Sequence, residues 1–178
     1  MKKKKFALER NADLSQLKGG QNMDFIPIEI HQHQKYVIPF RRDSFVVSFG
    51  SDKDFGEEQE YLNWLKQQSA KYPKGFVLVF ENDIPIGQLE LTVKQYQGKD
   101  IGYINLYYLI PEKRGMGIGS ELHNYALNFF KAHNLDKYHL RVSPTNPIAL
   151  AFYMKKGMEK LKPEMDGKVI RMSGEIPR

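Results

Sequence analysis

The stretch Pro111-Glu-Lys-Arg-Gly-Met-Gly-Ile-Gly-Ser120 lies between a strand-like segment and the most regular helical pattern of the chain. Its glycines, at positions 115, 117 and 119, permit positive φ angles and a close approach of the backbone to a ligand. The N–H groups of such a loop and of the helix behind it form an anion-binding site, and Arg114 adds a positive charge at its mouth. The stretch therefore predicts a site for a phosphate or a pyrophosphate.

Two common nucleotide-binding motifs do not fit this loop. A P-loop requires Gly-Lys-Ser/Thr, which the sequence lacks. A dinucleotide fingerprint would read Gly115-x-Gly117-x-x-Ser120, with its last glycine replaced by serine. Such a fingerprint also needs an acidic residue at the C-terminal end of the next strand, whereas Asp136 lies before that strand. A Rossmann unit also needs parallel strands on both sides of its crossover, and the strands before this loop form a meander. A glycine-rich turn without a ligand is the other alternative.

The apolar pattern on either side of the loop predicts a mixed α/β domain. Residues 119–133 give the strongest helix, because their apolar residues recur on one face. Short links between the segments 76–80, 84–93 and 101–110 predict an antiparallel meander. We expect further strands at 25–30, 138–142, 158–161 and 169–173, helices over 57–71 and 146–156, and a helix broken near Pro39 within 32–48.

The composition limits the class of protein. A chain of 178 residues has the length of one domain, and without cysteine it has no disulfide, thiolate metal site or cysteine nucleophile. No apolar run approaches about 18 residues, so no transmembrane helix is expected. The net charge of +6 would suit nucleic acid or a membrane surface. However, residues 1–22 hold six basic and two acidic side chains, so most of this excess lies there.

Residues 1–22 are predicted to be a basic N-terminal extension or an added leader, with residues 23–178 as the single domain. No apolar stretch follows Lys2 to Lys5, so these lysines do not begin a signal peptide. The run Gly19-Gly-Gln-Asn22 is typical of a linker, and Met23 is a suitable first residue. A short helix from Phe6 to Leu17, packed on the domain, is the alternative.

A second motif follows the predicted strand 138–142. Asn146 is a helix N-cap with Pro147 at the first helical position, Tyr153 comes seven residues after Asn146, and Gly157 lies past the helix end. Together with Arg114-x-x-Gly-x-Gly119, this motif resembles the two signatures of the GNAT superfamily of N-acetyltransferases. The sequence departs from the second signature at Lys156 and Met158, where an apolar residue and Phe are usual.

The resemblance implies the α/β (α+β) GNAT acyl-CoA N-acyltransferase fold, a mixed and mostly antiparallel sheet of about six to seven strands with helices on both faces. It implies acetyl-CoA as co-substrate and no metal. The pantetheine arm would insert where the strand before the loop splays from the strand after the helix. The cofactor-binding residues implied are Leu109, Ile110, Arg114, Gly115, Met116, Gly117, Ile118, Gly119, Ser120, Asn146, Phe152 and Tyr153.

Two catalytic side chains are predicted, Tyr153 and Glu90. In the resemblance Tyr153 is the general acid toward the CoA sulfur, and the Leu109 backbone N–H polarises the thioester carbonyl; a core aromatic is the alternative for Tyr153. Glu90 alternates onto the opposite strand face from Leu89 and Leu91 and is the carboxylate best placed to act as a base. A solvated, outward Glu90 is its alternative.

Three histidines are weaker candidates for the base. His139 lies on the strand after the main helix, where a plain surface position is the alternative. His31 and His33 lie near the expected acceptor side and make no complete set of metal ligands.

We expect an N-acetyltransferase that moves an acetyl group directly from acetyl-CoA to a primary amine of a small molecule or a peptide or protein, because no enzyme thiol exists to carry it. Residues 32–60 should form the acceptor pocket, although their aromatic residues also suit core packing, and Arg41-Arg42 would attract an acidic acceptor. The alternatives are a non-catalytic acyl-CoA-binding module or sensor, and a nucleic-acid binder acting through Lys2–Lys5. We expect a cytoplasmic protein without nucleic-acid or membrane partners; similar proteins form homodimers through sheet edges.

Overall fold

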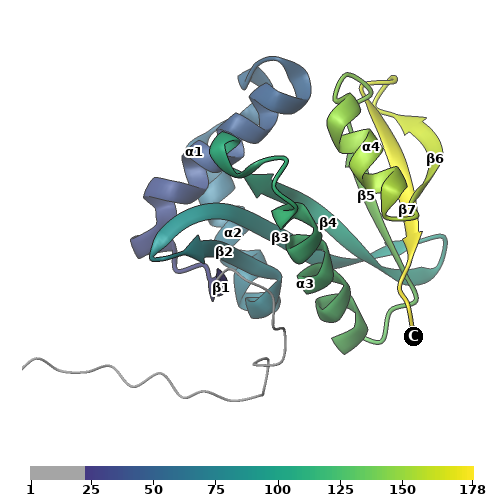
Figure 1. Cartoon of the computed structure of the whole chain (residues 1–178), viewed down its shortest axis with the longest axis horizontal. Coiled ribbons are helices and arrows are strands. Elements are labelled where there is room, and N and C mark those ends of the chain that lie inside the picture. Colours follow the sequence, from purple (N-terminus) through teal and green to yellow (C-terminus); the bar gives the residue numbers. More distant parts are fainter. Residues whose placement is uncertain (1–22) are drawn as a thin grey trace, which may run out of the picture.

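A seven-stranded sheet in the order β1-β2-β3-β4-β5-β7-β6 organises residues 23–178, the part of the chain that the computed structural model describes. Figure 1 shows α3 in front of this sheet and α2 behind it. The strands are β1 (Met23–Pro27), β2 (Phe76–Glu81), β3 (Ile84–Tyr96), β4 (Lys99–Leu109), β5 (Lys137–Val142), β6 (Glu159–Glu164) and β7 (Val169–Glu175). The helices are α1 (Ile30–Phe49), α2 (Glu58–Lys71), α3 (Ile118–Ala132) and α4 (Pro147–Lys155), with short 3-10 turns at Lys53–Phe55, Pro73–Gly75 and Pro111–Lys113.

The predicted meander is confirmed. Strands β1 to β4 pair antiparallel in sequence order, and the tight β2–β3 turn places Asn82 and Asp83 at positive φ, which these two residue types tolerate. Helix α3 then crosses over and makes β5 parallel to β4. The mixed, mostly antiparallel sheet with helices on both faces is thus the one that the resemblance implies.

The parallel pair β4–β5 is short, and this creates the central opening of the fold. The two strands pair only from Gly102 to Ile104 on β4 and from Tyr138 to Leu140 on β5. Beyond these residues each strand continues without the other, toward the glycine-rich loop on one side and toward α4 on the other (Figure 1). The splay that the resemblance implies is therefore present.

Close packing of α3 fixes one side of this opening. Helix α3 buries Leu122, Ala126 and Phe130 against the sheet. A Cβ added to Gly102 of β4 would lie 2.5 Å from the Phe130 ring, so only glycine admits this helix at its observed distance. Burial of a leucine or phenylalanine side chain, such as Leu122 or Phe130, contributes about 1.5–3 kcal/mol to stability. Helix α3 is therefore a rigid support for the loop at its N-terminus.

Two predictions near the start of the domain are wrong. The strand expected at 25–30 ends at Pro27, and Ile30 already begins α1. Helix α1 also runs unbroken through Pro39, where a break is expected from sequence. Proline removes one helical hydrogen bond, but Val37 and Phe40 on either side of it are buried in the core. Their packing compensates for that loss and holds the helix continuous to Phe49.

The predicted extension 1–22 and the helix suggested for Phe6–Leu17 lie outside the described residues. Within 23–178, no helix combines the length and the apolar character that crossing a bilayer requires.

Candidate active site

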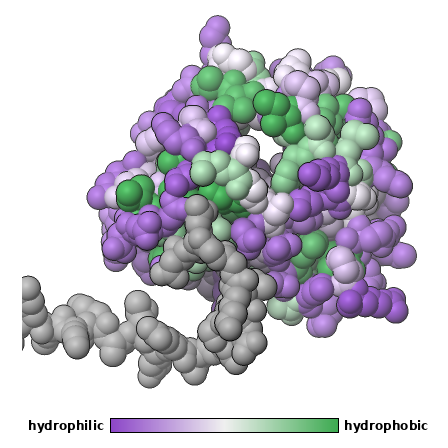
Figure 2. Space-filling model, in the orientation of Figure 1, coloured by the Kyte–Doolittle hydropathy of each residue, from purple (hydrophilic) through white to green (hydrophobic). Residues whose placement is uncertain are grey.

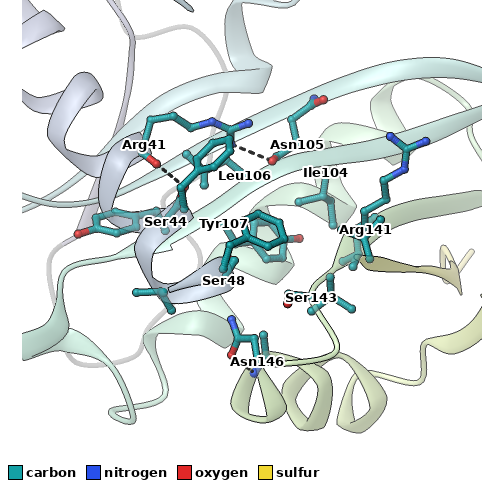
Figure 3. A pocket seen from close by; sticks show the side chains of 18 of the residues that line it. Arg41, Ser44, Ser48, Ile104, Asn105, Leu106, Tyr107, Arg141, Ser143 and Asn146 are labelled. Carbon is teal, nitrogen blue, oxygen red and sulfur yellow. Dashed lines mark hydrogen bonds between the residues drawn. The ribbon is translucent and has the colours of Figure 1, made fainter. Parts of the chain in front are cut away.

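A cavity of about 900 Å³ occupies the opening between β4 and β5 and is walled by α1, the start of α2 and α4. Figure 2 shows the surface hollowed there, with apolar residues on the rim; the exposed apolar side chains among its lining residues are Val47, Phe49 and Met165. Figure 3 shows Arg41 of α1 and Arg141 of β5 on either side of β4 residues Ile104 and Asn105. Two chain segments far apart in sequence also meet at the cavity, since the Thr145 hydroxyl donates to the Ser48 carbonyl at 3.1 Å.

The glycine-rich loop ends as the N-terminus of α3. Gly117 is the N-cap residue, with φ of 83°, a left-handed conformation that favours glycine. Gly119, in the first turn, lies against α4: a Cβ there would approach the Phe152 ring to 3.2 Å. The first-turn N–H groups of a helix have no partners within the helix and carry its positive dipole end. The helix start that the sequence predicts behind this loop is confirmed, and its role as an anion site stays a prediction.

Lys156 adds a positive charge to this helix N-terminus, and the sequence pattern alone did not place it there. Its ammonium donates to the Ser120 hydroxyl at 2.8 Å, across the short distance between the end of α4 and the start of α3. The pKa of His123 is lowered to about 4, mainly by burial and in addition by the Lys156 charge. The departure from the family signature at Lys156 thus places a cation beside the loop.

Arg114 fastens the loop to the rest of the cavity wall. Its Nε donates to the Leu109 carbonyl at 2.8 Å, and its terminal nitrogen pairs with the Asp43 carboxylate of α1 at 2.8 Å. The Tyr108 hydroxyl donates to the same carboxylate at 2.8 Å. Burial is the main cause that raises the pKa of Tyr108, and this hydrogen bond is the second. Arg114 therefore lines the cavity while its contacts orient β4, the loop and α1 relative to one another.

The end of β4 directs a backbone donor into the gap. The Ile110 N–H bonds back to the Ile86 carbonyl of β3 at 2.9 Å. Because successive backbone groups of a strand point to opposite sides, the Leu109 N–H points away from β3, toward the space that β5 has vacated. Leu109 itself lines the cavity.

Helix α4 supplies Asn146 and Tyr153. The Asn146 side chain accepts from the Ala149 N–H at 3.2 Å and so caps the helix as predicted, a contact worth about 1 kcal/mol. Tyr153, two turns along, is half-buried and lines the cavity with Asn146 and Ala149. Burial, followed by the nearby Tyr138, raises the pKa of Tyr153. No hydrogen bond ties its hydroxyl to another residue of the described part of the chain.

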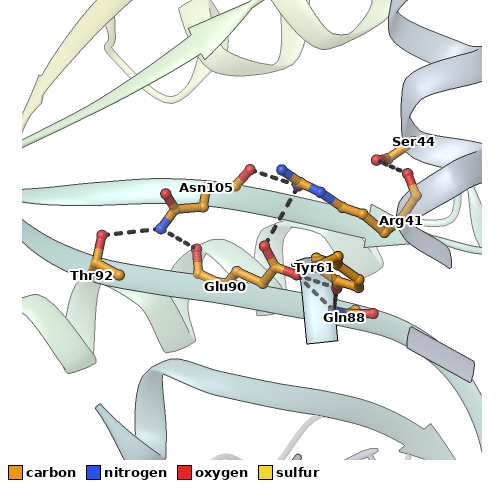
Figure 4. A network of polar contacts seen from close by, with 7 residues as sticks. All are labelled: Arg41, Ser44, Tyr61, Gln88, Glu90, Thr92 and Asn105. Atoms are coloured by element: carbon orange, nitrogen blue, oxygen red, sulfur yellow. Dashed lines mark hydrogen bonds and ion pairs between the residues drawn. The ribbon is translucent and has the colours of Figure 1, made fainter. Parts of the chain in front are cut away.

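Glu90 occupies a different place from Tyr153. Its side chain is fully buried in β3, not solvated, and it does not line the cavity. Its Oε1 accepts from the Tyr61 hydroxyl at 2.6 Å and from Gln88 at 2.9 Å, and Gln88 also donates to the Tyr61 oxygen at 3.0 Å (Figure 4). Tyr61 of α2 does line the cavity. Tyr61 therefore lines the cavity and also contacts the Glu90 carboxylate.

A β-bulge brings Arg41 to the other oxygen of this carboxylate. Glu90 pairs with Leu106 and Leu91 with Ile104, so Asn105 is an extra residue in β4. Its carbonyl accepts from Arg41 at 3.1 Å, and the Arg41 guanidinium lies 3.5 Å from Glu90 Oε2 (Figure 4). That oxygen has no hydrogen bond among the described residues. Arg41 thus balances the buried negative charge and lines the cavity as well.

The three candidate histidines do not face this cavity. His139 is buried, contrary to the surface position considered for it; Arg171 contacts its ring at 3.3 Å, and burial followed by the Arg171 charge lowers its pKa to about 4. His31 and His33 line a separate hollow beside Phe80, and His33 accepts from the Glu29 N–H at the start of α1. The expectation that they lie on the acceptor side is wrong, because α1 carries them to its far end. Within residues 23–178, no group of three metal-binding side chains gathers.

Sequence reasoning found the part of the cavity lining that comes from residues 32–60 and missed polar residues from elsewhere. Within the predicted acceptor region 32–60, the lining includes Arg41, Ser44, Phe45, Ser48 and Phe55. The polar lining residues that the sequence analysis did not single out include Tyr61, Lys94, Asn105 and Arg141. One signal was available: Gln88, Glu90 and Thr92 place polar groups on one face of an otherwise apolar strand, a pattern that predicts a buried polar network.

A sheet opened between two parallel strands, beside a glycine-rich loop that begins a helix, defines the acyl-CoA N-acyltransferase class of folds. The comparisons with known proteins agree. The model of the acetyltransferase (GNAT) family matches residues 38–158, and the chain belongs to this family.

Individual relatives are distant. An uncharacterized N-acetyltransferase of Methanocaldococcus jannaschii is 25% identical over 115 residues, which cover 62% of this chain; the match spans about half, 51%, of that relative's length. The PaiA N-acetyltransferase of Thermoplasma acidophilum, in complex with coenzyme A, has a TM-score of 0.63 at 20% identity, covering 86% of this chain and 99% of that one. Naa50 of Arabidopsis thaliana, in complex with the bisubstrate analogue CoA-Ac-MVNAL, has a TM-score of 0.62 at 19% identity, covering 85% and 97%. At these identities the two structures support the fold.

Proposed function

We propose that this protein is an N-acetyltransferase that transfers an acetyl group directly from acetyl-CoA to a primary amine of a small molecule or of a peptide or protein. The observation that carries the proposal is the cavity between the splayed β4 and β5. It is lined by Leu109, by Arg114 at the start of the glycine-rich loop, and by Tyr153, whose hydroxyl has no hydrogen bond within residues 23–178. Family membership and the coenzyme A complexes of proteins with the same fold support the choice of co-substrate.

The residues present fit acetyl-CoA. The loop and first turn of α3, with Ser120 and Lys156, suit its phosphates. The Leu109 N–H and the unpaired end of β4 suit the amides of its pantetheine arm, in the manner of an added strand. When bound, acetyl-CoA supplies the acetyl group as a reactive thioester. The Leu109 N–H then polarises the carbonyl oxygen, and Tyr153 donates its proton to the leaving sulfur.

Tyr61 and Glu90 provide a route for the proton of the acceptor. A protonated amine donates to Tyr61 Oη at the cavity wall while the Tyr61 proton passes to Glu90 Oε1, 2.6 Å away. The result is a neutral amine, a neutral tyrosine and a neutral glutamic acid. Gln88 donates to Tyr61 Oη and to Glu90 Oε1 and so holds both oxygens in place, while the Arg41 guanidinium lies 3.5 Å from Glu90 Oε2. In this way Glu90 acts from below the cavity wall.

A panel of amines with detection of released thiol tests the proposal. Turnover of acetyl-CoA that depends on an added primary amine is expected, with the acetylated amine identified by mass. Tight CoA binding without turnover of any amine would instead indicate a non-catalytic acyl-CoA-binding module.

Replacing Lys156 by alanine should weaken CoA binding. We expect the Kd of CoA to rise about three- to tenfold, the range for one partly exposed charge-assisted contact. Calorimetric titration measures this change. Lys155→Ala is the matched control, because Lys155 is the preceding residue in the same turn and is exposed. Equal effects of the two variants would show that Lys156 acts only through general charge.

A further inference from the structure

Basic side chains from several strands meet at one wall of the cavity. Lys94 of β3, Arg141 of β5 and Lys168, just before β7, line the cavity beside Tyr103 of β4. Below them Arg171 of β7 is buried, with its guanidinium 5.8 Å from the centre of the Tyr103 ring. We call Lys94, Arg141 and Lys168 the basic wall.

The basic wall carries more positive charge than its neighbours neutralise. Glu164 pairs with Arg141 Nε at 2.6 Å and with Arg171 Nε at 2.7 Å, and Lys162 approaches it to 3.7 Å. The hydrogen bond from Arg171 is the main reason that the pKa of Glu164 is lowered to about 2. Among residues 23–178 no other carboxylate pairs with these arginines, and none pairs with Lys94. The excess charge therefore faces the cavity.

Lys94 shows the energetic consequence of this imbalance. Its ammonium lies 3.5 Å from the centre of the Tyr103 ring. Loss of solvent, followed by the charges of Arg141 and Arg171, lowers the pKa of Lys94 to about 8. An anion bound between these groups would relieve the repulsion between them, so the wall favours a negatively charged ligand.

Arg141 indicates which anion fits. Only its Nε is used by Glu164, so its two terminal nitrogens remain for a ligand within the described structure. The planar end of a guanidinium matches a carboxylate. The wall lies beside Tyr103, where β4 and β5 are still paired, whereas the anion site proposed for CoA is at the start of α3. The two sites are therefore separate parts of the opening.

The opposite side of the cavity is acidic. Asp54, Glu57 and Glu60, between the end of α1 and the first turns of α2, line it. A cavity with carboxylates on one side and cations on the other favours a ligand that carries both charges. We propose that the acceptor is a primary amine that also bears a carboxylate, and that Lys94, Arg141 and Lys168 bind this carboxylate. The proposal rests on the proposed N-acetyltransferase function and names the class of its acceptor.

Matched pairs of acceptors test the proposal. One arm uses ω-amino acids of increasing chain length against their primary amides, which keep the shape and the amine but lose the negative charge. A second arm uses short, C-terminally amidated peptides with glutamate or glutamine near a free N-terminus. We expect the full-length protein to prefer the charged member by about tenfold or more in kcat/KM. The arm with the larger preference distinguishes a free amino acid from an acidic peptide.

Lys94→Gln should remove most of this preference. We expect it to raise the KM of the charged acceptor about tenfold, to leave the amide unchanged and to leave the Kd of CoA unchanged. Lys99→Gln, at the exposed start of β4 and outside the cavity lining, should change none of these values. Equal use of acid and amide by the unaltered protein, or an equal loss for both in Lys94→Gln, would overturn the proposal.

Calorimetry of the CoA-saturated protein separates this inference from the proposed function. Binding of the amino acids and not of their amides, without turnover, would keep the carboxylate site and reject the transferase. Turnover of amines without any charge preference would keep the transferase and reject the carboxylate site. If no acceptor of either kind binds or reacts, both proposals fail.

Discussion

Tyr153→Phe is expected to lower kcat by about 10²- to 10³-fold, within the range that a general acid contributes. The change removes one hydroxyl and leaves the ring, which packs beside Tyr107 with centroids 6.2 Å apart. Because burial raises the pKa of Tyr153, the hydroxyl keeps its proton at neutral pH and has one to give to a departing thiolate. The Kd of CoA should change little, since the phosphate contacts proposed for it lie at α3.

Two controls make this result specific. Tyr36→Phe removes the same atom from α1 outside the large cavity and should leave kcat unchanged. The general acid protonates the leaving thiolate, and a more acidic thiol leaves more easily without that proton. The loss of kcat in Tyr153→Phe should therefore be smaller with an acyl donor whose thiol is more acidic. A kcat within twofold of the unaltered protein would reject the role of Tyr153 as the acid.

The fold follows from local signals that the structure leaves intact. The glycine-rich loop, the one-sided helix after it and the Asn146-Pro147 helix start each depend on neighbouring residues, so the sequence places them correctly. The meander follows from short links between apolar segments. The helix break expected at Pro39 is the instructive error. The loss of one hydrogen bond at a proline can be read from the sequence, whereas the burial of Val37 and Phe40 that outweighs it depends on the folded domain.

The chemistry of the site was less accessible to sequence reasoning. The alternation of β3 fixes the face of Glu90, but its neighbours Arg41 and Tyr61 come from two helices more than 25 positions away. Whether a strand glutamate is solvated depends on what covers that face, and pattern alone does not say this. Lys156 illustrates the same limit, because its contact with Ser120 spans two motifs that only the fold brings together.

The Tyr61–Glu90 pair gives the second large prediction. Glu90→Gln and Tyr61→Phe are each expected to lower kcat/KM by about 10²-fold near neutral pH, because each breaks the route by which the acceptor loses its proton. The double variant should be about as active as either single one, since a relay can be interrupted only once. If the two substitutions only damaged the structure, their effects on kcat/KM would instead multiply in the double variant. Thr92→Val is the control for disturbing the same polar row: its hydroxyl accepts from Asn105 at 3.0 Å and takes no part in the relay.

The pH profile separates proton removal from misfolding. At a pH high enough for the acceptor to be mostly neutral in solution, no base is needed, so both variants should recover most of the lost kcat/KM. A damaged fold would not recover in this way, and melting temperatures measured alongside give its extent. An undiminished defect at high pH would reject the relay and assign Glu90 to holding Arg41 and the β-bulge at Asn105 in place. The Tyr61 hydroxyl donates to Glu90 Oε1 at 2.6 Å and belongs to a residue that lines the cavity, so the first outcome is the expected one.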